Sequence, residues 1–225
     1  MTVAVLSDFA TQRQTMVDCQ IRTFDVTDQD VIARFIDVPR EHFVPAALQA
    51  LVYSDAALEL RADGATRIML APLVLARMIQ GAGVTSTDRV LDVAGGAGYS
   101  AALLAGLAKE VVALESIASL SSQAAANLTS AGVTNAKAVS GPLDGSSVDG
   151  LYDLILVNGA VEEGIDSLLS KLAPGGRLIA VRKIAGHAGK VTRFEKVAGE
   201  TSHRVLFDAA APVLDAFARR QAFVF

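Results

Sequence analysis

The sequence contains one cysteine and no tryptophan, and aromatic residues make up only 5% of it. With Cys19 alone, no internal disulfide can form, and a cysteine-based metal site lacks ligands. The three histidines, at positions 42, 187 and 203, are far apart and show no ligand spacing. We therefore expect no metal ion.

Basic clusters and long apolar runs are absent as well. The net charge is −4 and the sequence pI is about 5.4, so we expect no nucleic-acid partner. The uncharged run 93–108 is broken by glycines and shorter than the roughly 20 residues of a spanning helix. The first fourteen residues lack the basic and apolar segments of a signal peptide. These absences predict a cytoplasmic protein without membrane partners.

The 225 residues are 52% hydrophobic and 20% charged, which is a globular composition. We expect a single domain over residues 1–225, with a helical N-terminal extension or cap at 1–84, a ligand-binding core at 85–184 and antiparallel strands at 185–225. In the extension, Thr27 can cap a helix that ends at Pro39. Further helices are expected at 45–52 and 71–83, and Cys19 is expected to be a buried helix residue.

From residue 85 the pattern alternates between strands and helices. Strands are predicted at 89–94, 110–115, 136–140, 152–160 and 177–184, and helices at 99–109, 117–132 and 162–176. The strands are almost continuously apolar, which indicates a parallel sheet covered on both faces. The fold class is therefore α/β, a doubly wound, mostly parallel Rossmann-like sheet. Later strands at 191–197, 203–209 and 220–225 are expected to be antiparallel.

The first core strand leads into the stretch "DVAGGAGY". Gly95, Gly96 and Gly98 allow a sharp turn and let a ligand approach the main chain. The second strand ends at Glu115, whose carboxylate can accept hydrogen bonds from both hydroxyls of a ribose. Because ligands of doubly wound sheets bind at the carboxyl ends of the strands, these residues predict a nucleoside site.

The loop does not match the dinucleotide pattern G-x-G-x-x-G, because no glycine stands at its last place. Asp92 at the strand end would repel a pyrophosphate and suits a cationic or zwitterionic ligand. S-adenosylmethionine carries a sulfonium and an amino group but no phosphate. The residues therefore favour a methyltransferase over a dehydrogenase.

Several motifs, taken in order along the chain, carry a resemblance to a known family. They are "MVDCQI" (16–21), "VPREHFVP" (38–45), "YSD" (53–55), "RVLDVAGGAGYSAALLA" (89–105), "VVALE" (111–115), "YDLILV" (152–157) and "LAPGGRLIAV" (172–181). In this order the chain resembles the protein-L-isoaspartate O-methyltransferase family. The resemblance implies methyl transfer from S-adenosylmethionine to the carboxylate of a damaged aspartyl residue in a protein or peptide, which begins protein repair.

The resemblance also implies a set of cofactor-binding positions. They are Asp92, Ala94, Gly95, Gly96, Gly98, Glu115, Ser116, Gly141 and Asn158. Ala94 takes the first glycine place of the loop, where one methyl can be absorbed if the residue keeps a negative φ. The family's Gly-Asp-Gly-like element near the adenine reads "SGPLDG" here, and Asp144 restores its acid only after a shift of two residues.

The substrate pocket is where the chain departs most from the family. The family's Thr-Ile-Ser-Gln-Pro-like stretch reads "IMLAP", so Ile68, Leu70 and Ala71 replace its polar residues, and Asn158 begins a changed turn after the fourth core strand. Arg67, Arg182 and Lys183 are the nearest cations for an anionic substrate. The alternatives are a cofactor-binding homologue without isoaspartyl activity and a methyltransferase for a less polar acceptor. The sequence assigns no catalytic residue and no oligomeric state.

Overall fold

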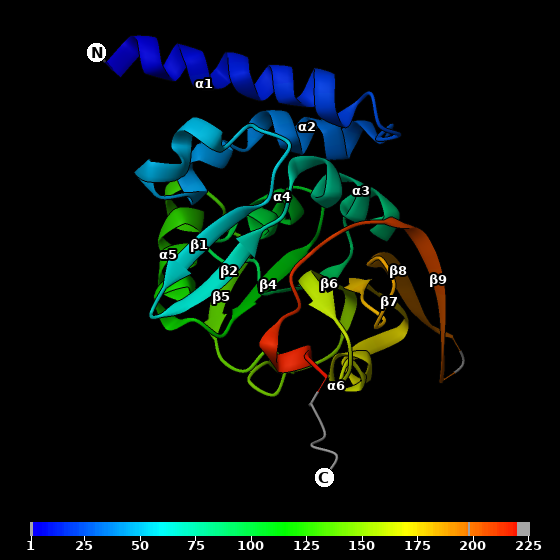
Figure 1. Cartoon of the computed structure of the whole chain (residues 1–225). Helices are drawn as coiled ribbons and strands as arrows, with labels where there is room; N and C mark the ends of the chain where they lie inside the picture. The colour runs from blue at the N-terminus through cyan, green and yellow to red at the C-terminus, as the bar shows by residue number, and fades with distance from the viewer. Residues whose placement is uncertain (1, 198, 220–225) are drawn as a thin grey trace.

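The computed structural model describes residues 2–197 and 199–219, and a seven-stranded sheet forms its centre (Figure 1). The strand order is β5-β4-β3-β6-β7-β8-β9. The strands are β3 (Arg89–Val93), β4 (Glu110–Glu115), β5 (Ala136–Ser140), β6 (Tyr152–Val161), β7 (Leu172–Arg182), β8 (Lys190–Val197) and β9 (Glu200–Asp208). The predicted strand 220–225 lies outside the described residues.

Pairing is parallel from β5 to β7 and antiparallel from β7 through β8 to β9, which confirms the predicted doubly wound sheet with an antiparallel end. Successive side chains point to opposite faces, so Val90 belongs to one apolar cluster and Leu91 to the other. The order reverses beside β3, which is paired with both β4 and β6. In doubly wound sheets the ligand binds at such a reversal, outside the carboxyl ends of the strands.

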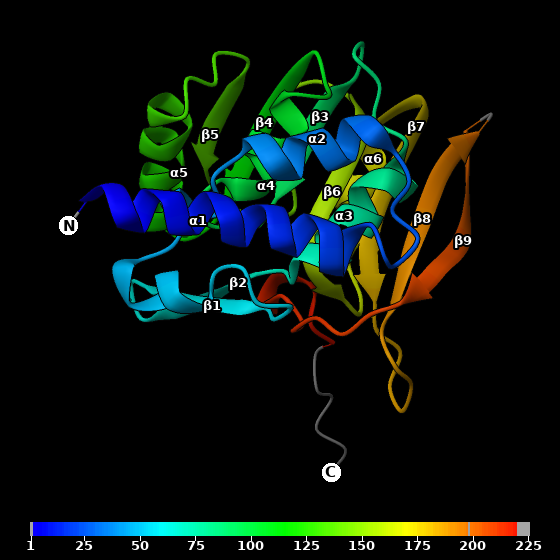
Figure 2. The same cartoon turned by 90° about the horizontal axis from the view of Figure 1, so that it is seen from above.

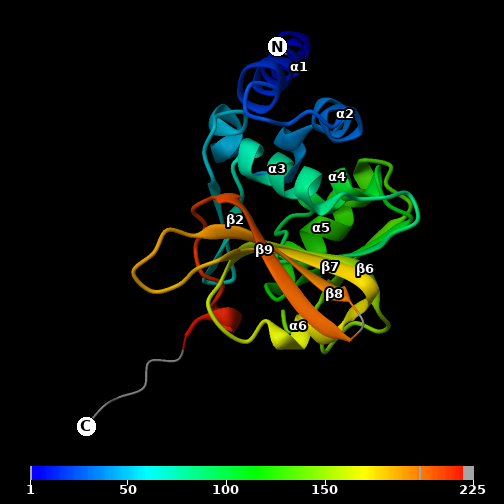
Figure 3. The same ribbon diagram turned by 90° about the vertical axis from the view of Figure 1, so that its right-hand side faces the viewer.

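Helices cover both faces of this sheet (Figure 3). They are α1 (Thr2–Met16), α2 (Gln29–Asp37), α3 (Pro72–Ala82), α4 (Tyr99–Ala105), α5 (Ala118–Ser130) and α6 (Asp166–Ser170), with short 3-10 helices at Arg40–Phe43, Ala46–Leu51 and Asp215–Phe217. Apolar residues of α3, α4 and α5 join one cluster, and α2 packs above them (Figure 1). Leu168 of α6 joins the other cluster. Within the described chain, none of the helices has the length and apolar character needed to cross a membrane.

Residues 58–69, expected within a helical extension, form an antiparallel hairpin of β1 (Leu58–Ala62) and β2 (Ala65–Met69) instead (Figure 2). Alternate residues are buried on each strand, such as Leu58 and Leu60 on β1. Asp63 and Gly64 at the turn both have positive φ, of 53° and 74°. An Asp-Gly pair between alternating strands is the usual two-residue hairpin turn.

Three local expectations are also wrong. Asp28 caps α2 in place of Thr27, because its carboxylate accepts from the backbone N–H groups of Asp30 and Val31. Cys19 is exposed, because the turn of π-helix at Val17–Ile21 buries only its two end residues. The helix predicted over 162–176 is limited to α6, because Leu172 already pairs with Tyr152 in the sheet.

Candidate functional site

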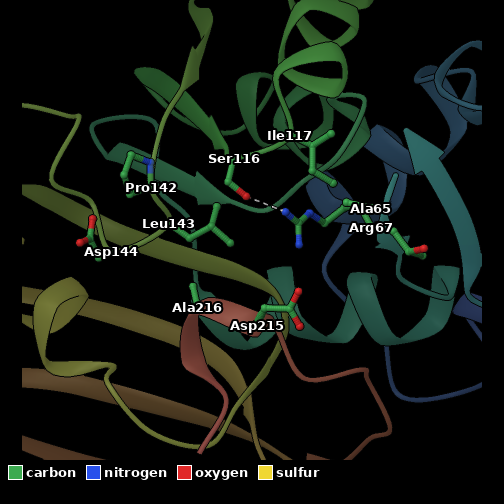
Figure 4. Close-up of a pocket in the computed structure, with 10 residues that line it drawn as sticks. Ala65, Arg67, Ser116, Ile117, Pro142, Leu143, Asp144, Asp215 and Ala216 are labelled. Carbon is green, nitrogen blue, oxygen red and sulfur yellow. Dashed lines mark hydrogen bonds between the residues drawn. The ribbon is translucent and has the colours of Figure 1, made fainter. Parts of the chain in front are cut away.

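A cavity of about 290 Å³ lies where β4 and β5 end (Figure 4). One wall is the hairpin of β1 and β2, and a second is formed by the loops after β4 and β5. The third wall is the 3-10 helix Asp215–Phe217. The lining residues are Ala65, Thr66, Arg67, Ser116, Ile117, Pro142, Leu143, Asp144, Asp215 and Ala216. The position is the one expected for a nucleoside, beside the carboxyl ends of parallel strands.

The glycine loop after β3 turns through left-handed backbone conformations. Gly96 and Gly98 have φ of 63° and 98°, a region open to glycine without steric cost. Ala94 has φ of 59°, so the expectation of a negative φ there is wrong. An alanine in this conformation costs about 1 kcal/mol. The loop keeps its turn because Ala94 is fully buried and its N–H donates to the carbonyl of Leu114 at 2.9 Å.

Gly95 is required for space rather than for its backbone angle. A Cβ on Gly95 would lie 2.4 Å from Oδ2 of Asp92 and 2.6 Å from Oγ of Ser100. Those two atoms are themselves hydrogen-bonded, with the Ser100 hydroxyl donating to the carboxylate at 2.6 Å. The Nδ2 group of Asn158 donates to Oδ1 of Asp92 at 2.7 Å and to the carbonyl of Val93 at 3.0 Å. This bonding ties the loop to β6.

Asp92 is fully buried, and both of its oxygens are hydrogen-bonded. Burial raises the pKa of its carboxyl from the ordinary 3.8 to about 6. Hydrogen bonds from Ser100 and Asn158 act against this rise, and the carboxylate of Glu115 adds to it. The contact of Asp92 with a ligand amino group stays a prediction. In this structure the side chain lies against Gly95 and is hydrogen-bonded to Ser100 and Asn158, which holds the loop in place.

Glu115 ends β4 and is buried beside the cavity. Its Oε2 accepts from the N–H of Gly96 at 3.1 Å, and its Oε1 accepts from the N–H of Ile117 at 3.0 Å. The guanidinium of Arg67 forms a forked ion pair with the same carboxylate, with Nη2 at 2.6 Å from Oε1. Glu115 therefore lies next to the predicted loop, and its binding of a ribose stays a prediction.

The remaining predicted cofactor positions are near the same cavity. Ser116 lines it, and its hydroxyl accepts from Nη2 of Arg67 at 3.0 Å. The N–H of Gly141 donates to the carbonyl of Glu115, and a Cβ there would lie 2.2 Å from Oγ of Ser147. Asp144 also lines the cavity, and its carboxylate accepts from the N–H of Ser146 at 2.8 Å, which lowers the pKa of Asp144. Its adenine-side role is one of the alternatives that the sequence leaves open.

The predicted substrate positions do not line this cavity. Leu70 is buried, Ile68 and Ala71 are half-buried, and Asn158 is bonded beneath the loop. The backbone of Leu70 is held from behind, because its carbonyl accepts from Nη2 of the fully buried Arg40 at 2.8 Å. The stretch that replaces the family's polar residues is thus an apolar segment with a fixed main chain.

Sequence reasoning missed the role of two segments at this site. Arg67 was a candidate for holding a substrate anion, but its partner is Glu115, 48 residues further along the chain. The C-terminal 3-10 helix contributes Asp215 and Ala216, because Leu214 N–H donates to the carbonyl of Ala160 at the end of β6. Among the described residues, no group of three His, Cys, Asp or Glu side chains is arranged to hold a metal ion.

Fold and site together define a Rossmann-like nucleoside-binding protein, with a glycine loop after its first core strand and an acid after the next. Residues 11–210 match the family described as protein-L-isoaspartate(D-aspartate) O-methyltransferase. The chain belongs to this family, whose members are S-adenosylmethionine-dependent methyltransferases.

Curated relatives agree with this placement. A protein-L-isoaspartate O-methyltransferase from Methanoculleus marisnigri is 37% identical over 170 residues, which cover 75% of this chain and 76% of the relative. One of the same name from Herpetosiphon aurantiacus is 38% identical over 172 residues and 75% of each chain.

Solved structures show the same fold. A protein-L-isoaspartate O-methyltransferase structure aligns with a TM-score of 0.79 at 23% identity, over 90% of this chain and 65% of that one. A Plasmodium falciparum protein of the same description, in complex with S-adenosyl-L-homocysteine, aligns with a TM-score of 0.74 at 20% identity. It is covered over 98% of its length, and this chain over 92%.

Proposed function

We propose that this chain transfers the methyl group of S-adenosylmethionine to the carboxylate of an isoaspartyl residue in a protein or peptide. The observation that carries the proposal is the carboxylate of Glu115, which lies between the glycine loop and a cavity at the carboxyl ends of β4 and β5. The residues fit an adenosyl group, because the acid suits ribose hydroxyls and the cavity adjoins Ser116 and Ile117.

The bound cofactor supplies an electrophilic methyl group on a sulfonium. The residues of this chain have the task of holding the ribose at Glu115 and the amino-acid part along the main chain of the glycine loop. The acceptor carboxylate has a pKa near ~4 and is already an anion at neutral pH, so no general base is required. Alignment of two reactants can lower a barrier by roughly 7 kcal/mol or more. Binding and orientation therefore suffice in principle for the reaction.

The first test is a calorimetric titration with S-adenosylmethionine, followed by labelled methyl transfer to an isoaspartyl peptide. Glu115→Gln should weaken cofactor binding about tenfold or more, because hydrogen bonds to a charged group contribute roughly 1.5–3 kcal/mol. Glu110→Gln is the matched control, since Glu110 starts the same strand at its opposite end and pairs with Arg89. Equal affinities of the two variants for S-adenosylmethionine would show that Glu115 does not bind the cofactor.

A second candidate function is supported by the apolar stretch at Ile68, Leu70 and Ala71, and it is methylation of a less polar acceptor. A buried carboxylate without partners is disfavoured by a few kcal/mol. A cofactor-binding homologue without transfer activity remains the third candidate. Binding of the cofactor without transfer to the isoaspartyl peptide would reject the leading proposal and leave these two.

The double substitution Ile68→Thr with Leu70→Ser tests the acceptor directly. If the isoaspartyl carboxylate binds beside this stretch, the new hydroxyls should raise kcat/KM for an isoaspartyl peptide by about tenfold. Leu70 is buried, so the variant also loses stability, and its free energy of unfolding must be measured in parallel. The single variant Ile68→Thr, at a half-buried position, is the milder control. A folded double variant with no gain would place the acceptor elsewhere.

Cell location and partners are proposals of the same kind. An exposed thiol such as Cys19 suits a reducing compartment, which supports the cytoplasm as the location. The proposed partner is a protein or peptide that carries the acceptor carboxylate.

A further inference from the structure

Arg67 lies over the glycine loop and belongs to none of the motifs that carry the family resemblance. It stands on β2 opposite Leu60, and both side chains face the loop. A Cβ added to Gly96 would lie 3.0 Å from Cδ1 of Leu60 and 3.4 Å from Cγ of Arg67. The tip of the hairpin is also held, because the carboxylate of Asp63 accepts from the N–H of Ser119 at 3.0 Å. The hairpin therefore covers the loop and presents Arg67 to the ribose position.

The hydrogen-bond capacity of Glu115 is fully used in this arrangement. Its two oxygens take three contacts from Arg67, at 2.6, 3.0 and 3.1 Å, and one each from two backbone N–H groups. A carboxylate offers about four acceptor sites. No site is left for the two hydroxyls of a ribose while Arg67 keeps this position.

The surroundings of Arg67 nevertheless allow its guanidinium to move away from Glu115. Its Nε and Nη2 bind Glu115 and Ser116, whereas Nη1 makes no hydrogen bond within residues 2–197 and 199–219. In Figure 4 the third nitrogen of Arg67 points into the cavity, toward the side where Asp215 stands. Asp215 is an exposed carboxylate on the cavity wall, and it offers the displaced cation a new partner.

We propose that Arg67 competes with the cofactor ribose for the carboxylate of Glu115 and thereby sets the cofactor affinity of this chain. The inference rests on the proposed function, which assigns the ribose to Glu115. Binding then exchanges a buried ion pair for hydrogen bonds from two hydroxyls. The affinity for the cofactor is therefore lower than it would be if Arg67 did not occupy the carboxylate of Glu115.

The test is calorimetric titration of S-adenosylhomocysteine into wild type and Arg67→Gln. Glutamine removes the charge and keeps an amide donor near Glu115, so the variant should bind the ligand about tenfold more tightly than wild type. Arg67→Lys, which keeps the charge but cannot form the fork, should fall between them. Arg61→Gln is the matched control, because Arg61 pairs with Glu59 on the exposed side of the same hairpin. It should leave the affinity unchanged.

A second ligand separates competition from a structural role. The 2′,3′-dideoxy analogue of S-adenosylhomocysteine lacks the hydroxyls, so Arg67→Gln should gain little or no affinity for it. Denaturant unfolding of each variant shows whether the fold is kept.

The possible outcomes are distinct. Equal or weaker binding of S-adenosylhomocysteine by Arg67→Gln, with wild type still binding, would overturn the inference and leave the proposed function intact. A gain of the same size for both ligands would also overturn it, because the hydroxyls would then play no part. If neither wild type nor any Arg67 variant binds the cofactor, the proposed function itself fails, and the inference with it.

Discussion

Arg177→Met is expected to reduce the free energy of unfolding by about 3–5 kcal/mol, the range for breaking a buried ion pair. Arg177 is a buried residue in the middle of β7. Its Nη2 donates to Oδ2 of Asp88 and to the carbonyl of Gly83, both at 2.6 Å. Its Nε donates to the carbonyl of Ala82 at 2.6 Å, and its Nη1 to that of Asp153 at 3.1 Å.

This one side chain thus holds the end of α3 and the loop before β3 against the sheet. Burial alone would raise the pKa of Asp88, but hydrogen bonds from Arg177 and Thr85 outweigh it and hold the pKa below its ordinary value. Loss of Arg177 removes the charged partner of that carboxylate, which keeps only its bonds from Thr85, and one donor from each of three carbonyl groups. The uncompensated buried charge and the lost hydrogen bonds account for the expected size of the effect.

The measurement is denaturant unfolding of wild type and Arg177→Met, with Arg61→Met as the control. Arg61 forms an exposed pair with Glu59, so its loss should change stability by about 1 kcal/mol or less. Arg177→Lys keeps the charge without the fork and serves if the methionine variant does not fold. A loss below about 1 kcal/mol for Arg177→Met would show that the pair contributes no more than an exposed one.

The core of the fold could be predicted from sequence because its signals are local. Short apolar runs gave the parallel strands, and "DVAGGAGY" placed a tight loop after the first of them. The hairpin carried an equally local signal, since Asp63 and Gly64 separate two alternating segments. The helices predicted on either side of it, at 45–52 and 71–83, favour a helical extension and outweigh this short signal.

The parts that could not be predicted depend on contacts between distant segments. Nothing near Arg67 indicates that its partner is Glu115, and nothing near Arg177 points to the end of α3. The positive φ of Ala94 is imposed by the loop around it, since alanine by itself avoids this conformation. The functional motifs could therefore be predicted from the sequence, whereas the contact between Arg67 and Glu115 could be found only in the structure.

Asp92→Asn is expected to remove a pH dependence of stability. In the folded chain the pKa of Asp92 is about 6, against 3.8 as its ordinary value, so the folded state holds a proton more tightly than the unfolded state. The free energy of unfolding should therefore fall as pH rises from about 4 to about 6 and stay constant above that. A shift of about two pKa units corresponds to a loss of roughly 3 kcal/mol.

Asparagine fits the same place, because its carbonyl can accept from Asn158 and its amide can donate to the Ser100 hydroxyl. At pH 7 the variant should be more stable than wild type by up to about 3 kcal/mol, and at pH 4 the two should be nearly equal. The measurement is denaturant unfolding between pH 4 and pH 8, with Asp149→Asn, at an exposed acid, as the control. Parallel curves for wild type and Asp92→Asn would mean that burial does not raise the pKa of this carboxyl. A larger gap at pH 7 than at pH 4 would instead show that the glycine loop is built over an acid that is destabilising when charged. If the amino group of the cofactor binds beside Asp92, as the sequence predicts, its positive charge reduces that destabilisation.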